Sequence, residues 1–179
     1  MQKGYRRPAR VLHWLLAVIV IAMLPVGGIM VTEGLDRATQ NLLFILHKNT
    51  GVLILLLMLV RLLYRLTHPP SPLPASVPGW QRRAAGLSHL ALYIMVFFMA
   101  ITGYIRVTMG GFPIEALEAI GLHPLLPRNE AVAEIAKTLH FYGRYVLIAI
   151  LALHIAAALH HALILRDGVF GRIWPFWRA

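Results

Sequence analysis

The sequence predicts an all-α integral membrane protein, a bundle of four transmembrane helices in a single domain over residues 1–179. The first observation is composition: 59% of the residues are hydrophobic and 13% are charged, where soluble domains have roughly 45–50% and about 25%. The second is the mean hydropathy of +0.69. The third is distribution, because four apolar stretches are long enough for helices that cross a hydrocarbon core of about 30 Å.

The four predicted spans cover residues 11–32, 42–66, 86–108 and 138–165. The first follows a basic flank like that of a secretory signal. Its apolar run is too long for a signal and lacks a small-residue cleavage site, so we expect an uncleaved helix. A proline-rich linker from His68 to Trp80 joins the second span to the third. Before the fourth span, the pattern from Glu115 to Ile120 predicts a short amphipathic helix at the outer membrane surface.

Basic residues predict the orientation of the bundle. They gather in the N-terminal tail, the connection between the second and third spans, and the C-terminal tail, where Asp167 is the only acid. By the positive-inside rule, both termini and this connection are cytoplasmic. Membrane lipid therefore accounts for the net charge of +10, and nucleic acid is not expected as a partner. The basic residues of these three regions are Lys3, Arg6, Arg7, Arg10, Arg61, Arg65, Arg82, Arg83, Arg166, Arg172 and Arg178.

The absence of cysteine narrows the possible chemistry. It excludes disulfides, thiolate zinc sites, iron–sulfur clusters and covalently attached c-type haem. Nine histidines remain as strong ligands for a transition metal. Because a metal-ligating or ionisable residue inside a span is costly, each such histidine is a functional hypothesis.

Four histidines fall at two matched depths. His140 and His154 are fourteen residues apart on the last span, so they return to within about 40° of one helix face and differ in depth by about 21 Å. His13 opens the first span on the cytoplasmic side, at the depth of His154. His47 opens the second span on the outer side, at the depth of His140. The inner pair His13–His154 and the outer pair His47–His140 therefore predict two b haems, each held by two histidines.

Other interpretations of the histidines compete with haem ligation. A single histidine at a membrane interface is usually a polar anchor, and paired histidines also bind zinc or copper. Four histidines at matched depths argue against anchors, and the lack of nearby carboxylates or thiolates argues against zinc or copper. His68 and His123 are expected to be surface residues. His89, His160 and His161 could each be a polar anchor at the membrane interface or part of a substrate site, and the sequence does not decide between these two roles.

Small and basic residues accompany the outer pair. Gly51 and Gly143 follow His47 and His140 by about one turn, and we expect them to let a porphyrin lie against the backbone. Cations on this side would raise the local concentration of a small anion. The alternative is that they pair with haem propionates or lipid headgroups. The cations concerned are Lys48, Arg106 and Arg144.

Several motifs spread over nearly the whole chain match one family. They are Tyr5-x-x-Pro8-x-Arg10-x-Leu12-His13-Trp14, His47-Lys48-x-x-Gly51, Val60-Arg61-Leu62-x-x-Arg65, Pro69-Pro70-x-Pro72, Leu87-Ser88-His89-Leu90-x-Leu92-Tyr93, His140, Leu153-His154-x-Ala156-Ala157-Ala158-Leu159-x-His161 and Arg166-Asp167-Gly168. On these residues the sequence resembles the prokaryotic cytochrome b561 family, which is related to the cytochrome b subunits of nickel–iron hydrogenases. The resemblance implies the same four haem ligands that the topology predicts.

The resemblance also implies a function. Members exchange electrons between a quinone on the cytoplasmic side and a donor at the outer, periplasmic face of a bacterial inner membrane. In the best-understood type, superoxide is oxidised to oxygen while ubiquinone is reduced, so superoxide:quinone oxidoreductase is the predicted activity. Superoxide would need only to approach a haem whose two axial positions are already occupied. The alternative is a haem b subunit that passes electrons between a partner dehydrogenase or hydrogenase, or another periplasmic redox partner, and the quinone pool.

A quinone site is expected near the inner pair. Members of the family usually have two adjacent histidines before the Arg-Asp-Gly motif, and in this sequence those two positions hold His161 and Ala162. This is a departure from the family. The second functional role of that pair is therefore expected for His161 rather than for His160. His161 lies seven residues beyond His154 and shares its helix face, from which it could donate a hydrogen bond and a proton to a quinone carbonyl. The other residues expected at this site are His89, Ser88 and Trp80.

Overall fold

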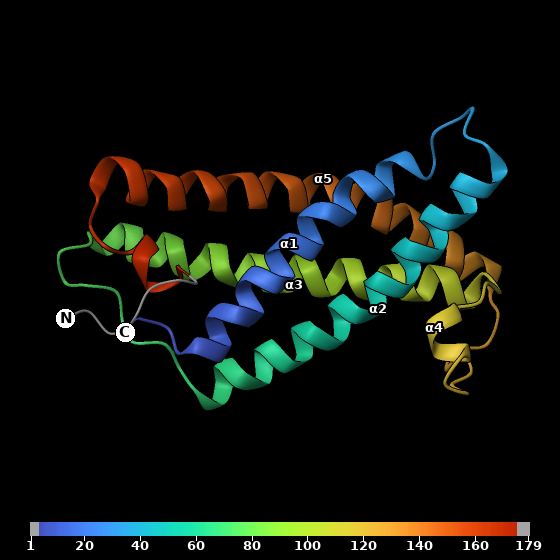
Figure 1. The fold of residues 1–179 in the computed structure, drawn as a ribbon, viewed down its shortest axis with the longest axis horizontal. Coiled ribbons are helices and arrows are strands. Elements are labelled where there is room, and N and C mark those ends of the chain that lie inside the picture. Colours follow the sequence, from blue (N-terminus) through green and yellow to red (C-terminus); the bar gives the residue numbers. More distant parts are fainter. Residues whose placement is uncertain (1–3, 175–179) are drawn as a thin grey trace.

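The computed structural model describes residues 4–174, which form helices joined by turns and loops (Figure 1). Four of the helices are long and apolar enough to cross a membrane, which confirms the predicted class of an all-α multi-pass membrane protein. The long helices are α1 (Arg7–Ile29), α2 (Arg37–Thr67), α3 (Gly79–Met109) and α5 (Glu130–Leu159), and the shorter elements are α4 (Glu115–Glu118), a π-helix η1 (His160–Leu165) that continues α5, and a 3₁₀-helix η2 (Phe170–Arg172).

The long helices begin earlier than the predicted apolar spans, and for α2 and α5 the reason is a polar residue that caps the helix. The Asp36 carboxylate accepts a hydrogen bond from Thr39 N (2.9 Å), and α2 therefore starts at Arg37. Asn129 caps α5 in the same way, accepting from Val132 N (3.2 Å). Such caps satisfy amide groups that a helix end leaves without a partner. Hydrophobicity alone detects the apolar part of each helix, so the capped polar turns were missed.

Packing is uneven around the bundle. α3 and α5 run side by side, α1 packs along α2, and α2 packs against α3 (Figure 1). Leu16, Ile54 and Met58 form a small core between α1 and α2, and side chains of α3 pack against it. Within residues 4–174, neither α1 nor α2 packs extensively against α5. Most other large apolar side chains are exposed, as expected for helices whose surroundings are lipid.

The two ends of the described chain meet at one end of the bundle. Tyr5 N donates to Arg172 O (2.9 Å), and Trp14 Nε1 donates to Ile173 O (2.8 Å). Arg172 is buried, donates to the carbonyl of Ser71 and lies over the ring of Tyr5. The segment after η1 therefore crosses the beginning of α1 and the proline-rich linker.

We call this end, with residues 4–10, 68–80 and 160–174, the terminal end; the distal end carries residues 30–48 and 106–144. Asp167 is the one described acid at the terminal end, whereas the distal end carries six. This asymmetry is the basis of the predicted orientation, which stays a prediction. Two of the basic residues that support it, Lys3 and Arg178, lie outside the described residues.

Candidate functional site

The structure brings the four predicted ligands together as two pairs. His47 of α2 and His140 of α5 meet near the distal end with ring centres 6.2 Å apart. His13 of α1 and His154 of α5 meet near the terminal end with ring centres 6.3 Å apart. We call these the distal pair and the terminal pair. Each pair bridges from α5 to a helix with which α5 does not pack extensively.

This spacing fits one metal held between two imidazoles. A metal–nitrogen bond of about 2 Å, followed by about 1 Å from nitrogen to ring centre, places two opposed rings about 6 Å apart. The buried Nδ1 atom of His47 has no hydrogen-bond partner, which is uncommon for a buried polar atom. Within residues 4–174, no group of three or more His, Cys, Asp or Glu side chains could hold a metal ion. The residues present therefore fit a haem with two histidine ligands better than a zinc or copper centre.

Glycines of neighbouring helices make room for the distal rings. A Cβ atom at Gly27 of α1 would lie 2.8 Å from His47 Cε1, and one at Gly103 of α3 would lie 3.1 Å from His140 Cε1. Such close approach requires a residue without a side chain. Sequence reasoning missed both glycines because they lie far along the chain from the histidines that they accommodate.

The two glycines singled out by sequence differ in their surroundings. A Cβ at Gly143 would lie 2.9 Å from Met99 Sδ and from Phe98 Cε1, so this glycine allows α5 to pack tightly on α3. This contact accounts for the glycine without a porphyrin, and its predicted role beside the haem stays a prediction. Nothing lies within 4 Å of a Cβ built at Gly51, and its predicted role stays a prediction.

Thr102 orients one ring of the distal pair. Its hydroxyl donates to the Phe98 carbonyl (2.7 Å), and its oxygen lies 3.2 Å from His140 Nδ1. Because the hydroxyl hydrogen is already used, the oxygen is available to accept from a protonated Nδ1. That arrangement leaves Nε2 free as a metal ligand, a role commonly supported by such a partner. This role of Thr102 could not be predicted, since a threonine inside a helix usually bonds its own backbone.

A third histidine lies against the terminal pair. The ring centre of His89 is 5.4 Å from that of His154, nearer than the ring of His13. That separation is shorter than the spacing of about 6 Å expected for two ligands on opposite sides of one metal. His13 is therefore the better ligand partner for His154, and His89 flanks the pair.

His161 forms a close pair with a carboxylate. Its Nδ1 lies 2.6 Å from Asp167 Oδ2, and the other carboxylate oxygen accepts from Val169 N (3.1 Å). The π-helix η1 carries His161, and Arg166 then adopts a left-handed conformation (φ 50°) that turns the chain back toward it. π-helical turns are frequent at functional sites. The signal for Asp167 was present in the sequence, because it is the single acid among the basic residues of the predicted cytoplasmic side.

The predicted quinone residues are not gathered into one contact cluster. His161 bonds Asp167, whereas His89 lies against His154. The side chain of Trp80 is 70% exposed. Within the part of the chain that the structure describes, no hydrogen bond or ring contact joins Trp80 or Ser88 to either histidine.

Lys48 binds the loop between α3 and α5, called the distal loop below, to α2. Its ammonium donates to the Pro113 carbonyl (2.8 Å) and to Glu115 Oε1 (2.7 Å), and its side chain is 13% exposed. Asn49 donates to Glu115 Oε2 (2.9 Å) and accepts from Ala116 N (2.8 Å). The predicted short helix, α4, is thus held beside the distal pair. The positive charge of Lys48 is compensated here, so the predicted attraction of an anion depends on the other two cations.

Arg106 and Arg144 have no carboxylate partner among the described residues. Arg106 lies about one helical turn beyond Gly103 of α3, the residue that approaches the His140 ring. The guanidinium of Arg144 lies over the rings of Phe141 (4.2 Å) and Tyr145 (4.6 Å) and donates to Tyr145 Oη. Arg106 is therefore the cation best placed to act at the distal pair.

The ion pair between Lys48 and Glu115 predicts a pH-dependent stability. Burial works to raise the pKa of the Glu115 carboxyl, but hydrogen bonds from Lys48, from its own backbone and from Asn49 outweigh it and hold that pKa below the ordinary 4.5. A carboxyl with a lowered folded-state pKa stabilises the fold above its ordinary pKa, and this contribution is lost as pH falls through the folded value. Since the side chain is 37% exposed, the pair is worth about 1 kcal/mol or less.

We therefore expect Glu115→Gln to lower the melting temperature by about 2–4 °C or less at pH 7, and the difference from wild type to disappear at a pH below the folded pKa of Glu115. Thermal melts of the two proteins across this range provide the measurement. Glu118→Gln is the matched control, because Glu118 lies on the same helix and has no ion pair among the described residues. A difference that persists unchanged at low pH would show that the charge of Glu115 is not what holds the loop.

Comparison with known proteins places these histidines in a family context. The chain matches the family described as prokaryotic cytochrome b561 over residues 4–176. It is 34% identical to cytochrome b561 homolog 2 of Escherichia coli K12, covering 90% of this chain and 86% of the relative. It is 24% identical to cytochrome b561 homolog 1 of the same organism over 92% of this chain and 93% of the relative. It is 29% identical to the probable superoxide oxidase CybB of Yersinia pestis over 98% of both chains.

Proposed function

The chain belongs to the prokaryotic cytochrome b561 family, and from that premise we propose that it is a di-haem electron-transfer protein that oxidises superoxide at its distal face and reduces ubiquinone near its terminal end. Family membership makes it a haem b-binding protein of membrane electron transfer. The number of haems and both substrates are part of the proposal.

The observation that carries the proposal is the presence of two histidine pairs at two depths, each with ring centres 6.2–6.3 Å apart. Haem b, when bound at each pair, supplies a one-electron carrier at that depth of the membrane. The absence of cysteine agrees with haem held only by histidines. The protein's own contribution is to hold the four rings in place. At the distal pair, this is done by Thr102, Gly27 and Gly103.

The charge asymmetry supports an orientation for the bundle. We propose that the protein lies in the inner membrane of a bacterium, with the basic terminal end toward the cytoplasm and the distal end toward the periplasm. The terminal pair would then lie on the side from which protons for quinone reduction are drawn.

A haem count tests the two-site proposal. We expect the purified protein to contain two b-type haems per chain, measured by a pyridine haemochrome assay together with a dithionite-reduced-minus-oxidised spectrum. A ratio of one haem per chain would reduce the proposal to a single site, and no haem would remove it. The spectrum would also distinguish b-type from other haems.

Charge at the distal end supports an anionic substrate. One relative is named a probable superoxide oxidase, and superoxide is a small anion. Arg106 lies about one helical turn beyond Gly103, which approaches the His140 ring, and it has no carboxylate partner in the described chain. Such a cation raises the local concentration of anions. Two superoxide ions would each give up one electron and leave as oxygen, while one quinone takes up two electrons and two protons to form the quinol.

Neutralising this attraction should slow the superoxide reaction. We expect Arg106→Glu to lower the rate of reduction of the oxidised protein by superoxide about tenfold. The wild-type rate should also fall as salt rises to physiological strength, where the screening length is about 8 Å. Arg37→Glu, a charge reversal elsewhere at the distal end, is the matched control. A slow rate that responds neither to salt nor to Arg106→Glu would contradict a steered anionic substrate.

A second function is favoured by the apolar surface of the distal loop. Phe112, Ile120, Leu122 and Leu125 are 57%, 69%, 54% and 86% exposed. Exposed apolar residues gathered in one loop can mark a protein contact. The alternative is therefore a haem b subunit that carries electrons between a partner dehydrogenase or hydrogenase and the quinone pool. Failure of the superoxide reaction, with both haems present, would favour this alternative.

A further inference from the structure

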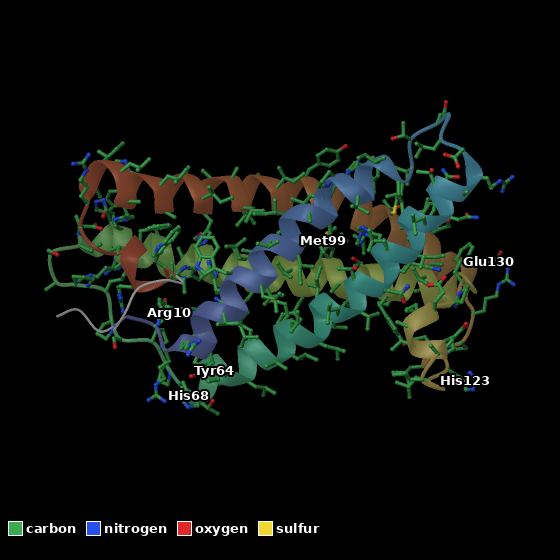
Figure 2. All side chains as sticks on the ribbon, in the orientation of Figure 1. Arg10, Tyr64, His68, Met99, His123 and Glu130 are labelled. Atoms are coloured by element: carbon green, nitrogen blue, oxygen red, sulfur yellow. The ribbon has the colours of Figure 1, made fainter. Side chains whose placement is uncertain are left out.

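A cleft opens at the terminal end between α1, α2 and α3. It is a small surface cleft whose enclosed space is about 20 Å³, room for about one water molecule. The polar side chains that matter here are Arg61, Tyr64, Arg65 and His68 of the end of α2, together with Tyr93 of α3. Figure 2 labels Tyr64 and His68 at this end of the bundle.

The charged groups of the cleft are all hydrogen-bond donors. The guanidinium of Arg61 lies 5.9 Å from the centre of the Tyr93 ring, and that of Arg65 lies 5.6 Å from it. A guanidinium has no acceptor capacity. The hydroxyl of Tyr93 is buried and has no hydrogen-bond partner. A buried hydroxyl without a partner is uncommon, and together these groups favour a ligand with several acceptor oxygens.

Among residues 4–174, no carboxylate forms an ion pair with the arginines of this cleft, Arg61 and Arg65. The acid at this end of the bundle, Asp167, is bound to His161 and to Val169 N. Two partly buried cations beside an unsatisfied hydroxyl therefore favour an oxyanion, a carboxylate or a phosphate.

The cleft adjoins the terminal pair. Arg61 Nη1 donates to the Ala9 carbonyl (3.1 Å), and Nη2 lies 3.2 Å from His13 Nδ1. This contact places Arg61 directly beside His13. An oxyanion bound in the cleft would therefore lie next to a group held by His13 and His154.

We propose that Arg61, Arg65 and Tyr93 bind the propionate carboxylates of the haem held by His13 and His154. This assignment rests on the proposed function. A lipid headgroup or free phosphate would offer the same oxyanion chemistry, so the experiment must separate these sources.

The test compares haem with its dimethyl ester, in which both propionates lose their charge. Apo-protein carrying His140→Ala, in which only the terminal pair can be loaded, is titrated with each and binding is followed in the Soret band. We expect Arg65→Gln and Tyr93→Phe to weaken haem binding about tenfold and to leave binding of the ester nearly unchanged. Arg83→Gln, an exposed arginine of the same end, is the matched control.

Tyr93→Phe keeps the ring on which both arginines stack, so it removes the hydroxyl with little change to the fold. Equal weakening for haem and ester would overturn the propionate assignment. Haem binding like that of wild type in both variants would also overturn it. A third contrary outcome is that inorganic phosphate, or vesicles containing phosphatidylglycerol, protect wild-type apo-protein but not Arg65→Gln against thermal unfolding. The last result would identify phosphate or lipid as the ligand. If the protein with both histidine pairs intact bound no haem, the proposed function itself would fail.

Discussion

Alanine in place of His154 is expected to lower the haem content from two haems per chain to one, with loss of the haem at the terminal pair. The ring of His154 is one half of that pair, at 6.3 Å from the ring of His13. No other side chain of α5 reaches the same position, because His140 lies about 21 Å away along the helix. His140→Ala should do the reverse and empty the distal pair. The measurement is the pyridine haemochrome ratio, with difference spectra of each variant.

The controls for this experiment follow from the geometry. His123→Ala changes an exposed loop histidine and should keep both haems. His89→Ala should also keep both, since its ring lies too close to His154 to be the opposite ligand. The spectra of the two single-haem variants should add to that of the wild type. Loss of the same haem in both ligand variants, or an unchanged ratio in either, would show that the pairing is wrong.

The fold and the histidine pairing could both be predicted because they depend on periodicity and depth. The rise per residue of an α-helix determines the depths of His140 and His154 along the last span. Successive helices cross the membrane in opposite directions, and this determines which helix ends lie at each of those depths. The helix termini were less predictable. Asp36 and Asn129 extend α2 and α5 by capping, and a capping side chain carries no hydrophobic signal.

Contacts between distant parts of the chain could not be predicted. Lys48 was expected to face an anion, yet it binds Glu115, a residue of a loop whose path no local pattern specifies. Gly27 and Gly103 accommodate rings from other helices, which depends on how the helices rotate about their axes. The π-helical turn that carries His161 likewise alters which face its side chain occupies. In each case the relevant distance is between helices, and a single sequence does not specify it.

The π-helical segment η1 carries His161, whose replacement is expected to have a large effect on quinone reduction. His161 and Asp167 form a hydrogen-bonded pair with an N–O distance of 2.6 Å, and their side chains are 16% and 21% exposed. The Asp167 carboxylate accepts a hydrogen bond from Nδ1 and thereby orients the imidazole ring. It also fixes which ring nitrogen points away from it, and a quinone carbonyl could accept a proton from that nitrogen. Asp167 is thus a positioning residue for His161.

His161→Ala is expected to slow quinone reduction by roughly a hundredfold, the lower range for loss of a general acid, while both haems stay in place. Asp167→Asn keeps a hydrogen-bond acceptor but removes the negative charge, so a smaller effect of about tenfold is expected. The measurement is the rate at which a short-chain ubiquinone reoxidises the pre-reduced protein, with haem content determined for each variant. His160→Ala, which changes the exposed neighbour, is the matched control. A wild-type rate in His161→Ala protein with full haem content would place quinone reduction elsewhere at the terminal end, and His89 would become the next residue to test, because it lies against His154.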